Sequence, residues 1–289
     1  MNLIDAILNT TNNLCQNSLG DPLSLLWLFF IFLSLQPVIR QRLIESLRQR
    51  LINKIEKERN SRVILIVHRQ ESMSLLGFPI LKYISMEDSE EVLRALEATE
   101  PEKDIDLVLH TPGGLVLASL QIARAIQNRK GKVRVIIPHY AMSGGTLIAL
   151  AADEIIMSPN AVLGPVDPQL GEYPAAALKN LLTKKDINEI EDKTLIYADI
   201  AEKAISQMQD AVYEILSKNY PEEKARELSH LLTEGKWTHD YPITASKATE
   251  LGINVQTDMP KIFMELMSLY KQPLLQRTKT VDYLQERAF

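Results

Sequence analysis

Several chemical features are scarce in this chain of 289 residues. Cysteine occurs once, as Cys15, so no disulfide can form within the chain and no oxidising compartment is implied. The five histidines have neither i, i+4 pairing nor cysteine partners, which leaves no zinc-binding spacing. No G-x-G-x-x-G follows a strand-like run, so the phosphate cradle of a dinucleotide site is missing. We therefore expect neither a metal nor a cofactor.

An excess of positive charge is also missing. The formal net charge of -5 argues against nucleic acid as a partner, because nucleic-acid binding usually requires a basic surface. Hydrophobic residues make up 46% and charged residues 24% of the chain, which is enough apolar material for one large core. The composition predicts one main globular domain with appendages.

Charge is absent from one long apolar run, PLSLLWLFFIFLSLQPVI at residues 22–39. Its length is close to the minimum that crosses a bilayer. Asp5 and Asp21 precede the run and Arg40 and Arg42 follow it, which is the reverse of a signal peptide. We expect a retained single-pass anchor that contacts lipid and leaves the rest of the chain in the cytoplasm. A hydrophobic core helix or an oligomer contact is the alternative.

A charged helical pattern follows the apolar run, with leucine or isoleucine at steps of four. It suits a helix along anionic headgroups or against a sister chain, and it equally suits a solvated helix. The expected order is an N-terminal segment (1–21), an anchor (22–39), a charged juxtamembrane helix (40–60), a globular domain (61–270) and a C-terminal tail (271–289).

Within the globular domain, short runs of branched apolar residues alternate with helical patterns. Strands are expected at 62–67, 104–109, 133–139 and 154–157, and helices at 86–96, 115–127, 193–219, 221–233, 243–251 and 259–270, with a further helix after Ser143. This alternation is typical of a layered α/β domain with parallel strands.

One strand-like run leads directly into a glycine turn. The stretch VRVIIPHYAMSGGTLIAL begins at Val133 and reaches Ser143, Gly144 and Gly145 before a helical pattern. The glycines permit positive φ and a close backbone approach, so the turn could present the hydroxyl of Ser143 outward. The alternative is that Ser143 merely caps the following helix.

A second glycine turn, H-T-P-G-G, ends the strand predicted at 104–109. If the two turns face each other, Ser143 would attack a carbonyl group. The N–H groups of Gly113 or Gly114, together with that of Gly144, would stabilise the oxyanion that develops.

The two turns and the later segment A-V-L-G-P-V-D-P-Q (161–169) resemble the ClpP class of serine peptidases, within the ClpP/crotonase fold. The chain is most similar to the membrane-associated serine dehydrogenase proteinase family, and is similar also to signal peptide peptidase A. The similarity covers about residues 61–270 and the anchor. It implies a spiral of ββα units, a nucleophile at Ser143, an oxyanion hole at Gly113 or Gly114 with Gly144, and a homo-oligomer.

The general base is less evident. Soluble ClpP uses a histidine, but no histidine lies between Ser143 and His230, and membrane-bound relatives use a Ser–Lys dyad. A buried lysine loses its proton because desolvation disfavours the cation, so it can accept a proton from serine. Lys203, which has Ile200 as an apolar neighbour, is the expected base. Lys185 is an alternative.

Three further interpretations concern polar residues that follow Ser143 in the chain. His239 with Asp240 keeps a Ser–His–Asp arrangement open, although a W-T-H-D segment is more often a helix entry. Lys203 could instead pair with Asp199 on a solvated helix face. Asp167 is expected to fix a turn near the substrate groove without direct chemistry.

These observations predict a membrane-anchored, ATP-independent serine peptidase that cleaves peptides or small membrane proteins. A dehydrogenase role is discounted because the dinucleotide fingerprint is missing. A crotonase-like acyl-CoA enzyme is one alternative, since it shares the oxyanion hole but needs no serine at the turn. A non-catalytic membrane scaffold is the other, favoured by the uncertain base.

Overall fold

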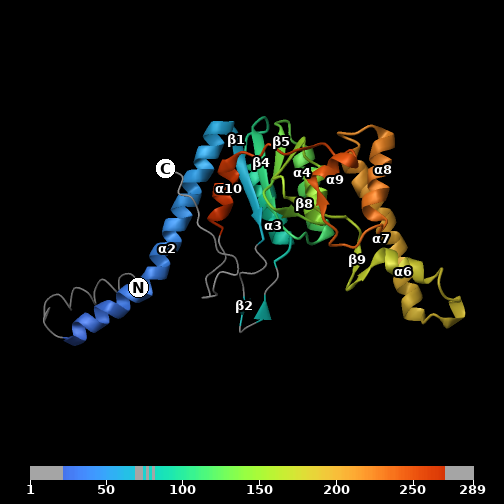
Figure 1. Cartoon of the computed structure of the whole chain (residues 1–289), viewed down its shortest axis with the longest axis horizontal. Coiled ribbons are helices and arrows are strands. Elements are labelled where there is room, and N and C mark those ends of the chain that lie inside the picture. The colour runs from blue at the N-terminus through green and yellow to red at the C-terminus, as the bar shows by residue number, and fades with distance from the viewer. Residues whose placement is uncertain (1–21, 69–73, 76–77, 80–81, 271–289) are drawn as a thin grey trace. The chain divides into compact units, whose positions relative to one another are not determined.

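The computed structural model describes residues 22–68, 74–75, 78–79 and 82–270 (Figure 1). The chain divides into two compact units, Met1–Asn53 and Lys54–Phe289. The predicted N-terminal segment (1–21) and tail (271–289) lie outside the described residues. The second unit begins at Lys54, inside the charged helix predicted for 40–60.

One helix, α2 (Pro22–Arg59), covers both the predicted anchor and the predicted juxtamembrane helix, and it continues through Pro37. Among the described residues, no helix is both long enough and apolar enough to cross a membrane. The side chains of residues 22–29, 31 and 32, which make up most of the predicted anchor, lie outside that description. The anchor therefore stays a prediction.

A parallel sheet forms the centre of the second unit. Its strands follow the order β1 (Ser61–Val67), β4 (Asp104–His110), β5 (Val133–Ile137), β7 (Glu154–Met157) and β12 (Val255–Gln256). The strands are rich in branched apolar residues because both faces of such a sheet are buried. The four strands predicted from these runs, and the parallel α/β arrangement, are confirmed. The two residues of β12 are too few to give a sequence signal.

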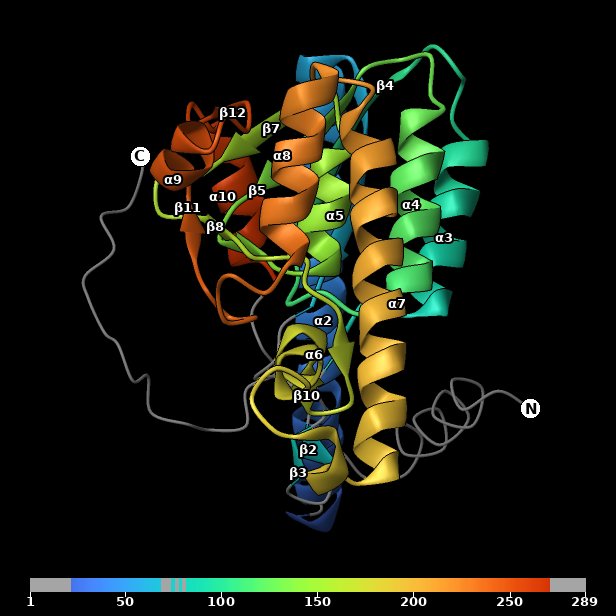
Figure 2. The ribbon, with the colours of Figure 1, turned by 90° about the vertical axis from the view of Figure 1, so that its right-hand side faces the viewer.

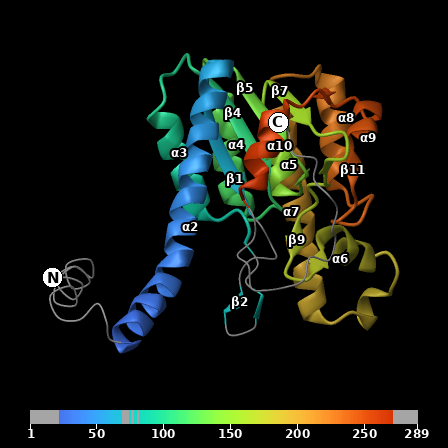
Figure 3. The same ribbon diagram turned by 60° about the vertical axis from the view of Figure 1, so that its left-hand side comes forward.

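Helices cover the sheet on both faces. Figure 2 shows α3 (Met86–Glu97), α4 (Val116–Gln127), α5 (Gly144–Leu150), α7 (Asp192–Leu216) and α8 (Glu222–Thr233) side by side. Helix α10 (Lys261–Ser268) lies on the face away from α4 (Figures 1 and 3). The predicted helices are thus present. The helix predicted at 243–251 is preceded by a short strand, β11 (Ile243–Thr244), and α9 is limited to Ala245–Glu250.

A smaller sheet lies beyond the ends of β5 and β7. It consists of β6 (Tyr140–Ala141), β8 (Val162–Leu163) and β11, with β8 in the middle. The remaining elements are β2 (Ser74–Leu75), β3 (Phe78–Pro79), β9 (Gln169–Leu170), β10 (Tyr173–Pro174), α6 (Ala175–Leu181) and a 3₁₀ turn (Ile187–Glu189). The pairing within this small sheet brings three loops together. They are the loop that follows β6, the loop that follows β8 and the loop that precedes β11.

A buried ion cluster fastens the last turn of α2 to the central sheet. The carboxylate of Asp106 is fully buried and accepts hydrogen bonds from Arg59 Nε (2.7 Å), Arg134 Nε (2.7 Å) and Ser61 Oγ (2.6 Å). Burial alone would raise the pKa of Asp106, but these hydrogen bonds outweigh it and hold the pKa below its ordinary value. Asp106 is therefore ionised, and its charge is matched by two guanidinium groups.

Replacing Asp106 with alanine should lower the free energy of unfolding by about 3–5 kcal/mol, because Arg59 and Arg134 would lose their buried counterion. Urea unfolding at pH 7 measures the change. Glu214→Ala, which breaks the exposed Arg124–Glu214 pair, is the control and should cost less than about 1 kcal/mol.

The contribution of Asp106 should also depend on pH. Since its pKa is lower in the folded state, the stabilisation is complete above the unfolded value of about 3.9 and is lost as pH falls through the folded value. The difference between wild type and Asp106→Ala should therefore shrink in acid. A difference that grows as the pH is lowered would contradict this assignment.

Candidate functional site

The two glycine turns meet at one edge of the sheet. Strands β4 and β5 are parallel neighbours, so their carboxyl ends lie at the same edge. A Cβ atom on Gly113 would lie 2.7 Å from Cβ of Ser143 and 3.0 Å from N of Gly144. The N–H of Met142 also donates to the carbonyl oxygen of Thr111 at 3.0 Å. The predicted meeting of the turns is therefore confirmed.

Ser143 has a strained backbone. Its φ of 50° and ψ of −116° are unusual for a residue with a side chain. Ser143 occupies the N-cap position of α5, but its side chain makes no capping hydrogen bond, so the interpretation that the serine merely caps the helix is wrong. Ser143 instead lines a cavity of about 460 Å³. A strained serine at a strand-to-helix turn is typical of a nucleophile.

Two backbone amides beside Ser143 are available to a ligand. The N–H of Gly113 donates to Thr111 Oγ1 at 3.2 Å. Within the described part of the chain, the N–H groups of Gly114 and Gly144 have no acceptor. Both residues line the cavity, and a Cβ on Gly144 would lie 3.5 Å from N of Gly114. Of the two predicted options at the first turn, Gly114 is thus the one with a free amide.

A histidine and an aspartate form a pair on the same cavity. Nδ1 of His239 lies 2.8 Å from Oδ1 of Asp167, and the aspartate side chain is almost fully buried. Nε2 of Gln169 donates to the other carboxylate oxygen at 2.6 Å. All three residues line the cavity with Ser143. If Nδ1 carries the proton donated to Asp167, Nε2 of His239 is left as an acceptor.

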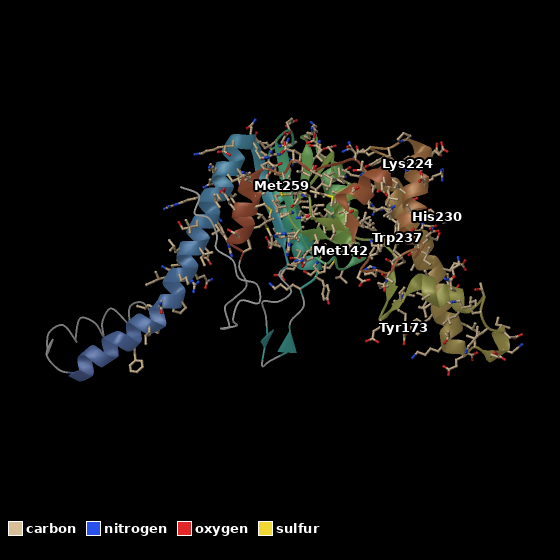
Figure 4. The ribbon with its side chains drawn as sticks, viewed as in Figure 1. Met142, Tyr173, Lys224, His230, Trp237 and Met259 are labelled. Atoms are coloured by element: carbon tan, nitrogen blue, oxygen red, sulfur yellow. The ribbon has the colours of Figure 1, made fainter. Side chains whose placement is uncertain are left out.

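This pair corrects two expectations. Asp167 does more than fix its own loop, because its carboxylate holds the ring of His239. The segment around His239 is not a direct helix entry either, since it forms a turn closed by the hydrogen bond from Tyr241 N to Thr238 O and then enters β11. Figure 4 labels Met142 and Trp237, which are near Ser143 and His239 in the chain; both lie above Tyr173 in this view.

The predicted lysines lie elsewhere. Lys203 is on α7 with its side chain 66% exposed, and its Nζ pairs with Oδ2 of Asp199 at 2.5 Å. The prediction that Lys203 is buried is therefore wrong. The helix buries Ala201 and Ile205 against α6, which leaves Lys203 on the solvent side. Lys185 is exposed after α6. Neither lysine lines the Ser143 cavity.

The walls of the cavity are largely apolar. They include Val116, Met142, Leu147, Val166 and Met208. Such walls suit an apolar side chain next to the reacting carbonyl. Across the residues that the structure describes, no group of three or more His, Cys, Asp or Glu side chains could hold a metal ion.

The second unit is a parallel α/β fold that brings a strained serine and two free amides to one cavity. The chain belongs to the ClpP-like SDH-type serine proteinases, whose family model matches residues 15–288. This membership confirms the resemblance to the serine dehydrogenase proteinase family.

Individual relatives agree with the family. Two uncharacterized proteins of Methanocaldococcus jannaschii, MJ0137 and MJ1495, are each 53% identical to the chain. The matches cover 91% of this chain and 94% of MJ0137, and 88% of this chain and 86% of MJ1495. The probable protease SohB of Haemophilus influenzae is 37% identical over 82 residues, or 27% of this chain and 23% of SohB.

Gly113→Ala should abolish labelling by an active-site fluorophosphonate. The new Cβ would collide with Cβ of Ser143, and the φ of +104° at position 113 is itself strained for alanine. Gly171→Ala is the matched control: φ is +65° there, but no atom lies within 4 Å of the added Cβ. The control should lose about 1–2 kcal/mol of stability and keep its labelling. Equal labelling of the two variants would show that the close approach is not needed.

Proposed function

We propose that this protein is a serine peptidase in which Ser143 is the nucleophile, His239 the general base and Asp167 the residue that orients the base. One observation carries the proposal. The strained Ser143, the paired His239 and Asp167, and the free amides of Gly114 and Gly144 line a single cavity.

In the acylation step, Nε2 of His239 removes the hydroxyl proton while Oγ of Ser143 bonds to the substrate carbonyl carbon. The carbonyl oxygen becomes negative and accepts hydrogen bonds from the N–H groups of Gly114 and Gly144. Asp167 stabilises the imidazolium through Nδ1. The imidazolium then protonates the leaving amine, and water releases the acyl group by the same route.

Within the described residues, the hydroxyl of Ser143 makes no hydrogen bond. Catalytic hydrogen bonds are often long in free enzymes and shorten when substrate binds, so this geometry is compatible with a base at His239. A Ser–Lys dyad has weaker support. The exposed, ion-paired ammonium of Lys203 lacks the desolvation that a lysine base requires.

The cavity and the family support one class of substrate. The apolar walls of the cavity favour peptides with an apolar side chain beside the scissile bond, from small membrane proteins among others. The name of SohB, a probable protease, supports peptide hydrolysis. We further propose that catalysis is independent of ATP and that the chain forms a homo-oligomer, as the family resemblance implies.

Labelling with a fluorescent fluorophosphonate tests the three roles. Ser143→Ala should show no labelling, and His239→Gln and Asp167→Asn should react about 10²–10⁴-fold more slowly than wild type. Lys203→Met is the control and should react within about 2-fold of wild type, because its side chain faces solvent.

The alternatives give different results. A rate that collapses in Lys203→Met but not in His239→Gln would assign the base to the lysine. Absence of labelling in the wild-type protein would instead favour the acyl-CoA enzyme or the non-catalytic scaffold.

We also propose that residues 22–39 anchor the protein in a membrane with the catalytic unit on the cytoplasmic side. The run contains no charged residue, and Arg40, Arg42, Arg48 and Arg50 follow it. Basic residues next to a membrane span favour the cytoplasmic side.

The single cysteine gives a direct test of this orientation. In intact cells, a membrane-impermeant maleimide should label Cys15, which precedes the apolar run. A Cys15→Ser, Ser217→Cys variant, whose new thiol replaces an exposed residue of the catalytic unit, should react only after detergent is added. The reverse pattern would invert the orientation, and release of the protein by alkaline carbonate would exclude an anchor.

A further inference from the structure

A series of polar contacts connects α3 with the glycine turn that contains Gly113 and Gly114. His68, which follows β1, is buried, and its Nδ1 lies 2.9 Å from Oγ1 of Thr111. Its Nε2 lies 3.5 Å from Oδ2 of Asp88. Thr111 is also fully buried, and its Oγ1 accepts the N–H of Gly113 at 3.2 Å. The contacts thus run from Asp88 through His68 and Thr111 to Gly113.

The far end of this chain is rigidly held. Asp88 lies in the first turn of α3, where its Oδ2 accepts hydrogen bonds from N and Oγ of Ser85, both at 2.8 Å. These bonds form a capping box with the helix start. Burial alone would raise the pKa of Asp88, but the Ser85 hydrogen bonds and His68 outweigh it and lower the pKa. Asp88 is therefore a fixed carboxylate facing Nε2.

The protons can be assigned from these partners. Burial lowers the pKa of His68 despite the nearby Asp88, and the charge of Lys82 acts in the same direction as burial. The ring is therefore neutral at pH 7 and has one donor and one acceptor. Nε2–H faces Asp88, so Nδ1 accepts a hydrogen bond from the hydroxyl group of Thr111. The lone pairs of Thr111 Oγ1 then remain for the N–H of Gly113.

The other side of the turn is held by main-chain bonds. Ile84 N donates to the carbonyl oxygen of Gly113 at 2.7 Å, and Leu115 N donates to that of Ile84 at 2.9 Å. A Cβ on Gly114 would lie 2.3 Å from N of Ile84, so the turn fits closely against this segment. The carbonyl of Gly113 and the N–H of Gly114 belong to one planar trans peptide, so the bond from Ile84 to the carbonyl oxygen directs the N–H to the opposite side. Gly114 lines the cavity that contains Ser143, and its N–H has no acceptor among the described residues.

We propose that His68 is a positioning residue for the oxyanion hole. Acting through the hydroxyl of Thr111, it fixes the peptide of Gly113 so that the N–H of Gly114 faces the carbonyl attacked by Ser143. This role rests on the proposed function of Ser143. His68 itself touches neither Ser143 nor the cavity that Ser143 lines.

Four substitutions distinguish the contributions of Nδ1 and Nε2 of His68 and of the hydroxyl group of Thr111. Thr111→Val removes the hydroxyl but keeps a methyl group beside Gly145, whereas Thr111→Ser keeps the hydroxyl. His68→Asn places an amide oxygen near the position of Nδ1. His68→Gln reaches the position of Nε2 instead and leaves Thr111 without its acceptor.

The measurement is the fluorophosphonate reaction, resolved into the maximal rate kinact and the concentration constant KI. Thr111→Val and His68→Gln should lower kinact by about 10–100-fold, below the 10²–10³-fold loss that follows removal of a whole oxyanion donor. KI should change by less than about 3-fold, because the oxyanion develops only during bond formation. Thr111→Ser and His68→Asn should retain kinact to within about 5-fold.

The outcomes are distinguishable. An unchanged kinact in Thr111→Val, with the wild type labelled at Ser143, overturns the positioning role and leaves the peptidase intact. Equal losses in His68→Asn and His68→Gln, with matching drops in the melting temperature, show a merely structural histidine and also overturn it. If the wild type is not labelled, the proposed function fails first. If the His68 variants do not fold, the comparison of Thr111→Val with Thr111→Ser tests the hydroxyl group through which His68 acts. Equal kinact values in these two variants would overturn the positioning role.

Discussion

The site depends on one close backbone approach, that of Gly113 to Ser143. Any side chain at position 113 would place its Cβ 2.7 Å from that of Ser143 and 2.8 Å from the carbonyl oxygen of Met142. The missing side chain therefore lets the first turn reach the second. The same approach places the amides of Gly114 and Gly144, which have no acceptor among the described residues, on the cavity that Ser143 lines. Without it, the amide of Gly114 would lie farther from Ser143, and only that of Gly144 would stay next to the serine.

The register of the central sheet fixes the positions of the two glycine turns. Asp106 on β4 is paired in register with Arg134 on β5, and Arg134 Nε donates to Asp106 Oδ1 at 2.7 Å. A slip of one residue between the strands would place the buried carboxylate against an apolar side chain, which is costly. The ion pair thus fixes the register at one end of the strands, and the register fixes where the two turns emerge at the other end.

The sequence was informative where the signal is local. Ser143 and the glycine turns were predictable because a strand-like run, a glycine pair and a helical pattern follow one another directly. The link between Asp167 and His239 was not, because it spans 72 residues and depends on the pairing of β8 with β11, two strands of two residues each. The prediction for Lys203 is wrong because its apolar neighbour Ile200 does not mark a buried face. Ile200 is exposed, and the buried face of α7 there is made by Ala198, Ala201 and Ile205.

The contrast between the histidine and the lysine follows from how each is held. Gln169 occupies one oxygen of the buried Asp167, which leaves the other oxygen for Nδ1 of His239. The ring is thereby fixed at one nitrogen, while the side chain remains 34% exposed on a cavity shared with Ser143. Lys203 is held only by Asp199, one helical turn away on a solvated surface, and nothing in that pair directs it toward the serine. A base needs both a fixed orientation and an open nitrogen, and in the described chain His239 has the first through Asp167 and the second through the cavity.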